Sequence, residues 1–300
     1  MRAGVLGSRR RYRDTWAAYG FLAPWLAGLL VLTLGPLAAS LYLSFTQFDL
    51  LDPPEWIGLE NYRQMATDPR FWKALRVSFT YVVLAVPLKL LAALGLAMLL
   101  KQGLRLAVLY RALLYLPSLL GASVAVALLW QRVFAGDGLL NHVLAAFGIT
   151  GASWISDPRY ALDTLVVLAV WQFGSPMIVF LAGLQQIPRD LYEAAGLDGA
   201  GAFRQFRRIT LPMLTPVIFF NLIFQTIEAL KAFTQAYVVS SGTGGPTDST
   251  LFFTLYLYQE AFAHFHMGYA SALAWVLMSI IGGLTAVMFA AQRYWVHYDE

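Results

Sequence analysis

The sequence predicts an all-α, polytopic membrane protein built as a bundle of six transmembrane helices. Hydrophobic residues make up 59% of the 300-residue chain, whereas charged residues make up only 13%. Polar side chains this scarce cannot cover the surface of a soluble protein of this size. The apolar residues gather in stretches long enough for a helix to cross a hydrocarbon core about 30 Å thick. Blocks such as LLAALGLAMLL lack the period-2 alternation of a transmembrane β-barrel.

Six apolar stretches are the expected spans of a single transmembrane domain covering residues 1–300. They lie at about residues 16–45, 77–100, 109–134, 161–184, 214–240 and 269–291. The first contains Pro24 and the Gly35-Pro36 pair, which a bundle tolerates where neighbouring helices satisfy the freed carbonyl groups. It is too long for a cleavable signal peptide, so we expect it to remain as an anchor. Each of the others exceeds the roughly 20 residues that a spanning helix needs.

The distribution of lysine and arginine predicts the orientation, because cytoplasmic segments hold the positive excess. The amino terminus, the second and fourth connections and the carboxyl terminus share one side, and their basic residues are Arg2, Arg9, Arg10, Arg11, Arg13, Lys101, Arg105, Arg111, Arg189, Arg204, Arg207, Arg208 and Arg293. The other side has only Arg63, Arg70, Lys73, Arg76, Arg132 and Arg159. Both termini are therefore expected in the cytoplasm. Topology explains the +4 net charge, and nucleic-acid binding is not expected.

The outer connections contain no expected disulfide or metal site. The chain has no cysteine, which excludes disulfides and thiolate ligands. Its four histidines are His142, His264, His266 and His297, and their spacing is weak for a metal. We expect the His264-x-His266 pair to cap the last outer loop instead. Aromatic and charged residues alternate over residues 60–76, which favours helices at the membrane interface.

Residues 185–213 form the most informative connection. Pro188 lies where proline favours the first turn of a short helix, and acidic Asp190 follows near the positive helix end. Gly199-Ala200-Gly201 predicts a sharp turn before a second short helix over residues 202–209. The residues alone permit two interpretations. The loop is either a docking surface for a cytoplasmic protein or an ordinary loop that obeys the positive-inside rule.

This connection resembles the EAA loop of binding-protein-dependent ABC importer permeases. The matching residues are Glu193-Ala194-Ala195, Asp198-Gly199-Ala200, Phe206, Ile209, Leu211-Pro212 and Pro216. The resemblance covers nearly the whole chain, including SFTQFDLLDPPEWIGLENY and KAFTQAYVVSSGTGGPTDST, and is closest to the carbohydrate branch, the relatives of the maltose and lactose permeases. It implies a type I importer permease in a bacterial or archaeal plasma membrane. Such a permease moves a sugar or related polyol, or alternatively glycerol phosphate, into the cytoplasm.

The resemblance also implies that the loop is a coupling helix seated on a cytoplasmic ATPase. The ATPase-coupling residues carried over are Glu193, Ala194, Ala195, Asp198, Gly199, Ala200, Phe203, Phe206 and Arg207. The chain has no G-x-x-x-x-G-K-[ST], so ATP and Mg²⁺ are expected only in a separate subunit, with no enzyme activity or cofactor here. The implied partners are a second homologous permease subunit, two ATPase copies, an extracytoplasmic solute-binding protein and membrane lipid.

The fifth span has a polar face that suggests a substrate path. Its polar residues, Asn221, Gln225, Glu228, Lys231 and Gln235, fall within a sector of about 120° on a helix. Trp171 and Gln172 of the fourth span could add an aromatic face and an amide for a sugar. The alternative is that a Glu228–Lys231 pair and interhelical amide hydrogen bonds only hold the bundle together.

Lys89, near the middle of the second span, is expected to be a counter-ion to Glu228 or to extend toward the interface. These buried charges also suit an ion-coupled secondary transporter. However, the two halves of the sequence show no inverted repeat, and an EAA loop has no function in a secondary transporter. A membrane enzyme is disfavoured, since no catalytic cluster of His, Asp or Glu is evident. The absence of arginine from the predicted path argues against a phosphorylated solute.

Overall fold

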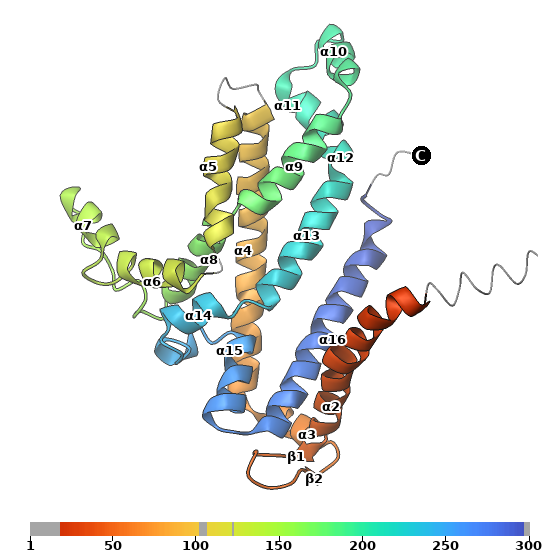
Figure 1. The fold of residues 1–300 in the computed structure, drawn as a ribbon. Coiled ribbons are helices and arrows are strands. Elements are labelled where there is room, and N and C mark those ends of the chain that lie inside the picture. Colours follow the sequence, from red (N-terminus) through yellow and green to blue (C-terminus); the bar gives the residue numbers. More distant parts are fainter. Residues whose placement is uncertain (1–18, 102–106, 122, 297–300) are drawn as a thin grey trace, which may run out of the picture. The chain divides into compact units, whose positions relative to one another are not determined.

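A computed structural model describes residues 19–101, 107–121 and 123–296, which are mostly helical (Figure 1). Several predicted features lie outside these residues: the start of the first span at residues 16–18, the amino-terminal Arg2, Arg9, Arg10, Arg11 and Arg13, and also Arg105 and His297. The described chain divides into two compact units. One contains the residues up to Met65 together with Glu260–Val276, and the other contains Ala66–Gln259 and the residues from Leu277 onward.

The first unit begins with a long helix, Tyr19–Leu43. Its middle widens into the π-helix η1 (Leu29–Leu34), which continues as α2 (Gly35–Leu43). The widening immediately precedes Pro36, which has no N–H to bond the carbonyl four residues earlier. A two-residue antiparallel ladder follows, with β1 (Thr46–Gln47) paired to β2 (Glu55–Trp56).

The turn after the first helix is held by Asn61, at the start of α3 (Glu60–Thr67). Its Nδ2 donates to the carbonyl oxygens of Ser44 at 2.9 Å and Thr46 at 3.0 Å. The backbone of Gly268 also approaches closely and donates to the Phe48 carbonyl at 3.1 Å. A Cβ at residue 268 would lie 2.1 Å from the Thr46 carbonyl oxygen, so only glycine fits this contact.

The second unit contains most of the helices. They are α4 (Pro69–Lys101), α5 (Ala107–Leu120), α6 (Val124–Val133), α7 (Leu139–Ala146), α8 (Ala161–Trp171), α9 (Gly174–Gln186), α10 (Arg189–Leu197), α11 (Ala202–Gln205), η2 (Phe206–Thr210), α12 (Leu211–Met213), α13 (Thr215–Leu230), α14 (Thr234–Val239), η3 (Pro246–Asp248) and α15 (Phe253–Tyr258). The segments η4 (Gln259–Ala263) and α16 (Met267–Gln292) run from one unit into the other.

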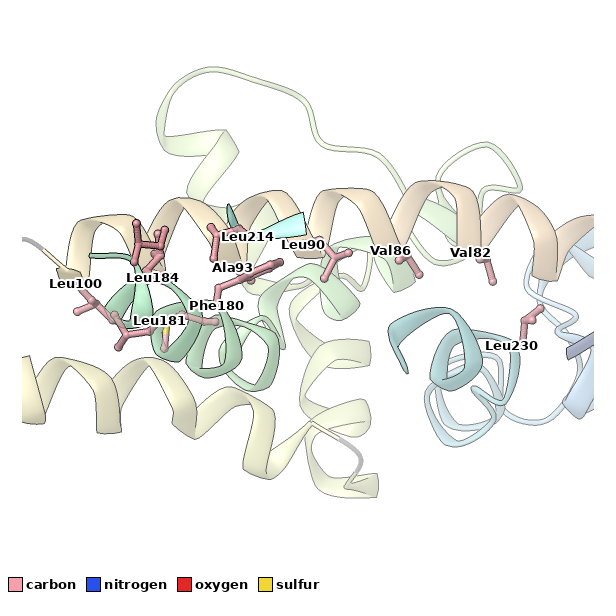
Figure 2. Packing of buried hydrophobic residues seen from close by; sticks show 13 residues of the cluster. Val82, Val86, Leu90, Ala93, Leu100, Phe180, Leu181, Leu184, Leu214 and Leu230 are labelled. Atoms are coloured by element: carbon pink, nitrogen blue, oxygen red, sulfur yellow. The ribbon is translucent and has the colours of Figure 1, made fainter. Parts of the chain in front are cut away.

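The core of the second unit lies where α9 and α13 pack on α4 (Figure 2). The buried residues of α4 recur every three or four positions, as one helix face requires: Val82, Val86, Leu90, Ala93, Ala97 and Leu100. Ala93 and Ala97 are fully buried, and their small side chains allow a neighbouring helix to approach α4. Phe180 and Leu184 of α9 fill the adjoining space (Figure 2).

Three of the six expected spans are interrupted in the structure. The stretch 109–134 divides into α5 and α6, which meet at an angle of 96°, and the stretch 161–184 divides into α8 and α9 with a bend of 42°. The stretch 214–240 breaks between α13 and α14 at Lys231–Phe233. By length and composition, four described helices can cross a membrane if Thr215–Val239 is counted as one helix across its short break, and six if each of the two bent pairs also forms one span. The helical bundle is therefore confirmed.

The two ends of α4 contact different connections. At the Arg70 end, the guanidinium bonds Asp248 Oδ1 at 3.2 Å and Gln259 Oε1 at 3.0 Å. At the other end, Lys101 contacts Tyr192 of α10. The connections around residues 248 and 192 therefore lie at opposite ends of one long helix, as the alternating topology requires.

A close approach of α9 to the backbone of α5 yields a stability prediction. A Cβ at Gly174 would lie 2.8 Å from the Leu114 carbonyl oxygen and 2.8 Å from the Tyr115 Cα. Because backbone atoms cannot easily move aside, we expect Gly174→Ala to destabilise the protein by about 1–3 kcal/mol. Thermal unfolding in detergent, followed by tryptophan fluorescence, measures this.

The control is Gly95→Ala on α4, where an added Cβ meets nothing within 4 Å. This variant should be neutral, or more stable by about 0.5–1 kcal/mol because alanine favours a helix over glycine. Equal unfolding temperatures for the two variants would contradict the proposed close packing of α5 on α9.

Candidate substrate path and coupling surface

The second unit encloses a cavity of about 350 Å³. This volume lies within the range of small-molecule sites, about 300–1,000 Å³. Its lining combines charged, amide, hydroxyl and aromatic groups: Lys89, Glu228 and Lys231; Gln172, Gln225 and Gln235; Ser118, Ser175 and Thr234; Tyr81, Phe224 and Phe233. Five of the seven residues predicted for the substrate path therefore share one cavity.

Two helix breaks face each other at this cavity. Ser118 of α5 donates its hydroxyl proton to the Gln172 carbonyl at 2.9 Å and accepts from the Ser175 N–H at 3.0 Å. In the opposite direction, the Gln172 Nε2 donates to the Gly121 carbonyl at 3.0 Å. Each break thus supplies side chains that satisfy backbone groups freed by the other, as a non-aqueous environment demands.

The break between α13 and α14 joins the same network. Gln235 donates from Nε2 to the Gly121 carbonyl at 3.0 Å, so this oxygen accepts from two glutamine amides. The Thr254 hydroxyl donates to the freed carbonyl of Ala232. The amide nitrogens of Gln172 and Gln235 consequently support the backbone, although both residues line the cavity.

The charged part of the predicted path remains accessible. The Lys231 Nζ lies 3.3 Å from the Glu228 Oε1, and about half of each side chain is exposed. Gln225, one turn before Glu228, is buried in the wall of the cavity. Lys89 of α4 lines the same cavity. These residues can offer a solute both hydrogen-bond donors and acceptors.

Two residues predicted for the path do not line the cavity. Asn221 is only 2% exposed, and its Nδ2 has no hydrogen-bond partner among the described residues. Trp171 packs against Trp130, with 5.8 Å between the ring centroids. Gln172 lines the cavity and Trp171 does not, as expected for adjacent residues, whose side chains lie about 100° apart around a helix.

Aromatic groups for the path come instead from residues that the sequence reasoning did not select. Phe224 lies beside Gln225 on α13, and Phe233 lies within the break between α13 and α14. Tyr81 lines the wall from α4. The only sequence signal for Phe224 was its place next to the polar face. Phe233 could be placed in the cavity wall only after the break between α13 and α14 was known.

The predicted coupling loop contains the two expected short helices, α10 and α11 with η2. They extend beyond the end of α9 in Figure 1. Gly199 has φ +74°, a left-handed conformation that glycine adopts readily and other residues adopt at a cost. The Ala200 N–H donates to the Ala195 carbonyl at 2.8 Å and closes the turn.

This loop presents large apolar side chains outward. Leu197 is 90% exposed and Phe203 is 76% exposed. Of the predicted coupling residues, the exposed ones are Glu193, Ala194, Asp198, Gly199, Phe203 and Arg207, and the half-buried ones are Ala195, Ala200 and Phe206. Exposed apolar groups mixed with charges form a surface suited to a protein partner.

The loop is fixed to the bundle through Tyr192, which the sequence reasoning did not single out. Lys101 Nζ lies 3.3 Å from the Tyr192 hydroxyl and 4.4 Å from the ring centroid. The same hydroxyl is 2.9 Å from the Thr210 Oγ1. Tyr192 therefore connects α10 to the end of α4 and to the segment that leads into α12.

The fold and the site together define a polytopic membrane transport protein. Residues 65–296 match the family described as "Binding-protein-dependent transport system inner membrane component", and the chain belongs to this family. It is a permease component of an ABC importer, in agreement with the resemblance of its EAA loop.

Full-length relatives support the assignment. A probable ABC transporter permease from Bacillus subtilis, YesP, is 50% identical, with 98% of this chain and 96% of the relative covered. The lactose permease LacF of Rhizobium radiobacter is 36% identical over 95% of this chain and 97% of the relative. The trehalose/maltose permease MalF of Thermococcus litoralis is 31% identical over 96% and 98%.

Solved structures show the same fold. A chain of the bacterial alginate ABC transporter, in complex with alginate pentasaccharide-bound periplasmic protein, superposes with a TM-score of 0.82 at 19% identity. The superposition covers 95% of this chain and 96% of that chain. The type I importer permease architecture is therefore retained at low sequence identity.

The hydroxyl of Ser118 provides a test of the network between the helix breaks. Ser118→Ala removes the partner of both the Gln172 carbonyl and the Ser175 N–H. A hydrogen bond contributes about 0.5–1.5 kcal/mol, and these two are not fully buried, so we expect a modestly lower unfolding temperature. Ser175→Ala, which keeps that N–H, is the matched control and should unfold as the wild type does. Full stability of Ser118→Ala would show that the two hydrogen bonds of Ser118 contribute nothing to stability.

Proposed function

We propose that this permease moves a carbohydrate or related polyol, delivered by an external binding protein, through the cavity at the helix breaks. The observation that carries the proposal is the lining: carboxylate, ammonium and amide groups beside Phe224 and Phe233. Sugars present hydroxyl groups at the ring edge and apolar C–H groups on its faces, so they bind polar and aromatic side chains together. The names of the lactose and trehalose/maltose relatives support this class.

The charge of the cavity narrows the substrate further. Lys89 and Lys231 outnumber Glu228, which leaves a formal charge of +1 from two lysines and one glutamate. This charge favours neutral or anionic solutes over cationic ones. Because a glycerol-3-phosphate permease from Pectobacterium atrosepticum is 32% identical over 98% of this chain, glycerol phosphate is the second candidate.

The coupling loop is proposed to seat on a cytoplasmic ATPase subunit. The exposed Leu197 and Phe203 provide the apolar contact, and Arg207 can pair with acidic groups of the partner. In this assembly the chain pairs with a second homologous permease and two ATPase copies, and a solute-binding protein docks outside. Both termini then lie in the cytoplasm, as the distribution of arginine and lysine favours.

Uptake by the intact transporter identifies the solute class. Cells or proteoliposomes are supplied with neutral disaccharides, acidic oligosaccharides, glycerol 3-phosphate and a cationic amine as separate radiolabelled solutes. Uptake of a neutral or acidic sugar supports the proposal. Uptake restricted to glycerol 3-phosphate selects the second candidate, and uptake restricted to the amine contradicts the assigned charge preference.

Glu228→Ala tests whether the charged pair acts on the solute. Loss of a hydrogen bond to a charged group costs about 1.5–3 kcal/mol, so uptake should fall about 10- to 100-fold. Thermal stability and basal ATPase activity should stay within error of the wild type, because Glu228 and Lys231 are half exposed. If the variant lost stability and kept normal uptake per folded molecule, the pair would serve only to hold the bundle together.

Gly199→Ala tests the coupling loop. A Cβ at residue 199 would meet nothing within 4 Å, so the substitution acts through the left-handed backbone alone. The cost is about 1–2 kcal/mol, which shifts the loop conformation. We expect a several-fold loss of the ATPase stimulation produced by loaded binding protein.

The matched control is Gly201→Ala in the same turn. Gly201 has φ −67°, which alanine adopts without strain, and an added Cβ meets nothing within 4 Å. This variant should retain wild-type stimulation. Wild-type stimulation in both variants would remove the assignment of the loop as the coupling element.

A further inference from the structure

Three metal-ligating side chains meet in the connection before α16. Glu260 accepts at Oε1 and Oε2 from different histidines: the Nδ1 of His264 is 3.1 Å from Oε1, and the Nδ1 of His266 is 2.9 Å from Oε2. One potential ligand atom from each residue lies within 4.8 Å of the other two. The sequence suggested only a histidine pair that caps a loop, because Glu260 lies on the preceding helical turn.

The backbone between the two histidines is strained in a way that brings them together. Phe265 has φ +60°, although it is not glycine. A left-handed conformation is unfavourable for a bulky residue, by roughly 1–2 kcal/mol. Phe265 is 52% exposed, so burial of this residue does not compensate for the conformation. Strain of this kind is common at ligand sites, where the surrounding structure maintains it.

Neighbouring hydrogen bonds hold this turn in place. The His266 N–H donates to the Glu260 carbonyl at 2.8 Å, and the Met267 N–H donates to the Phe265 carbonyl at 2.9 Å. Directly after the turn, Gly268 donates to the Phe48 carbonyl and packs too closely for any side chain. The three ligating groups therefore start from a preorganised arrangement.

The spacing of the three groups fits a metal ion. Zinc binds imidazole nitrogen and carboxylate oxygen at about 2.0–2.1 Å, which separates tetrahedral ligands by about 3.3 Å. The two observed nitrogen–oxygen separations, 3.1 and 2.9 Å, are only slightly shorter. The three ligand atoms lie within 4.8 Å of one another, so an ion that replaced the two hydrogen bonds would draw the two histidines closer together.

Exposure leaves a coordination position open. The side chain of Glu260 is 10% exposed, whereas those of His264 and His266 are 46% and 58% exposed. Solvent can thus approach the histidines while the carboxylate stays mostly buried. Three protein ligands with a free fourth position are typical of zinc sites that bind water or another ligand.

We propose that Glu260, His264 and His266 form a site for a divalent transition-metal ion, with Zn²⁺ as the best fit. Imidazole ligands suit Zn²⁺, Cu²⁺ and Ni²⁺, whereas Mg²⁺ and Ca²⁺ prefer oxygen ligands only. The ion would fasten the turn to the start of α16. In the predicted topology this turn lies in the last outer connection, where extracytoplasmic metal ions have access.

Zinc binding to the full-length protein tests the proposal. The protein is purified without a histidine tag, because a tag would itself bind Zn²⁺, and is reconstituted in nanodiscs. Isothermal titration with Zn²⁺ should show one saturable site per chain that Mg²⁺ does not compete for. His264→Ala, His266→Ala and Glu260→Gln should each weaken binding at least tenfold.

Two further variants separate ligation from folding. His142→Ala removes a histidine of α7 whose Nδ1 bonds the Gly138 carbonyl, and it should bind Zn²⁺ as the wild type does. The double variant with His264→Asn and His266→Asn retains amide donors for Glu260 but loses both imidazoles, so it should fold and bind no Zn²⁺. Wild-type Zn²⁺ affinity in this double variant would overturn the proposal, as would the absence of saturable binding to the wild type.

Discussion

The requirement that every backbone group inside the membrane find a partner within the protein governs the centre of this structure. Three spans are broken, and each break frees N–H and carbonyl groups. The side chains of Ser118, Gln172 and Gln235 bond these groups across helices that are 51 to 114 residues apart in the chain. The breaks must therefore lie next to one another, and the cavity forms where they meet.

Two helices, α9 and α13, connect the cavity with the predicted coupling loop. α9 begins at the break after Gln172 and ends at the coupling loop, whereas α13 begins beyond that loop and ends at the break at Lys231. Both helices pack on the same face of α4 (Figure 2). The connection that holds α10 and the cavity lining are therefore joined by helices that share one packed apolar core.

The hydropathy of the chain was sufficient to predict a helical membrane bundle, and local chemistry was sufficient to predict the turn and the two short helices within residues 185–213. Pro188, the EAA residues and Gly199 determine the conformation of the backbone only within a few residues. The turn and both short helices could therefore be predicted from the local sequence. The bends of the third and fourth spans did not follow, because the Gly, Ser and Pro residues near them are also tolerated in transmembrane helices that continue as one span. A bend there depends on a partner such as Ser118 that belongs to another helix.

The composition and helical period of the sequence by themselves determined that the protein is a helical membrane protein, the number of its apolar stretches and most of the polar residues that reach the cavity. Only the tertiary structure decided that Gln172 and Gln235 bind a carbonyl oxygen, that Asn221 and Trp171 lie outside the lining, and that Glu260 lies beside two histidines. The physical reason is that hydropathy is a property of each segment, whereas the satisfaction of a polar group requires a second segment at a specific distance and angle.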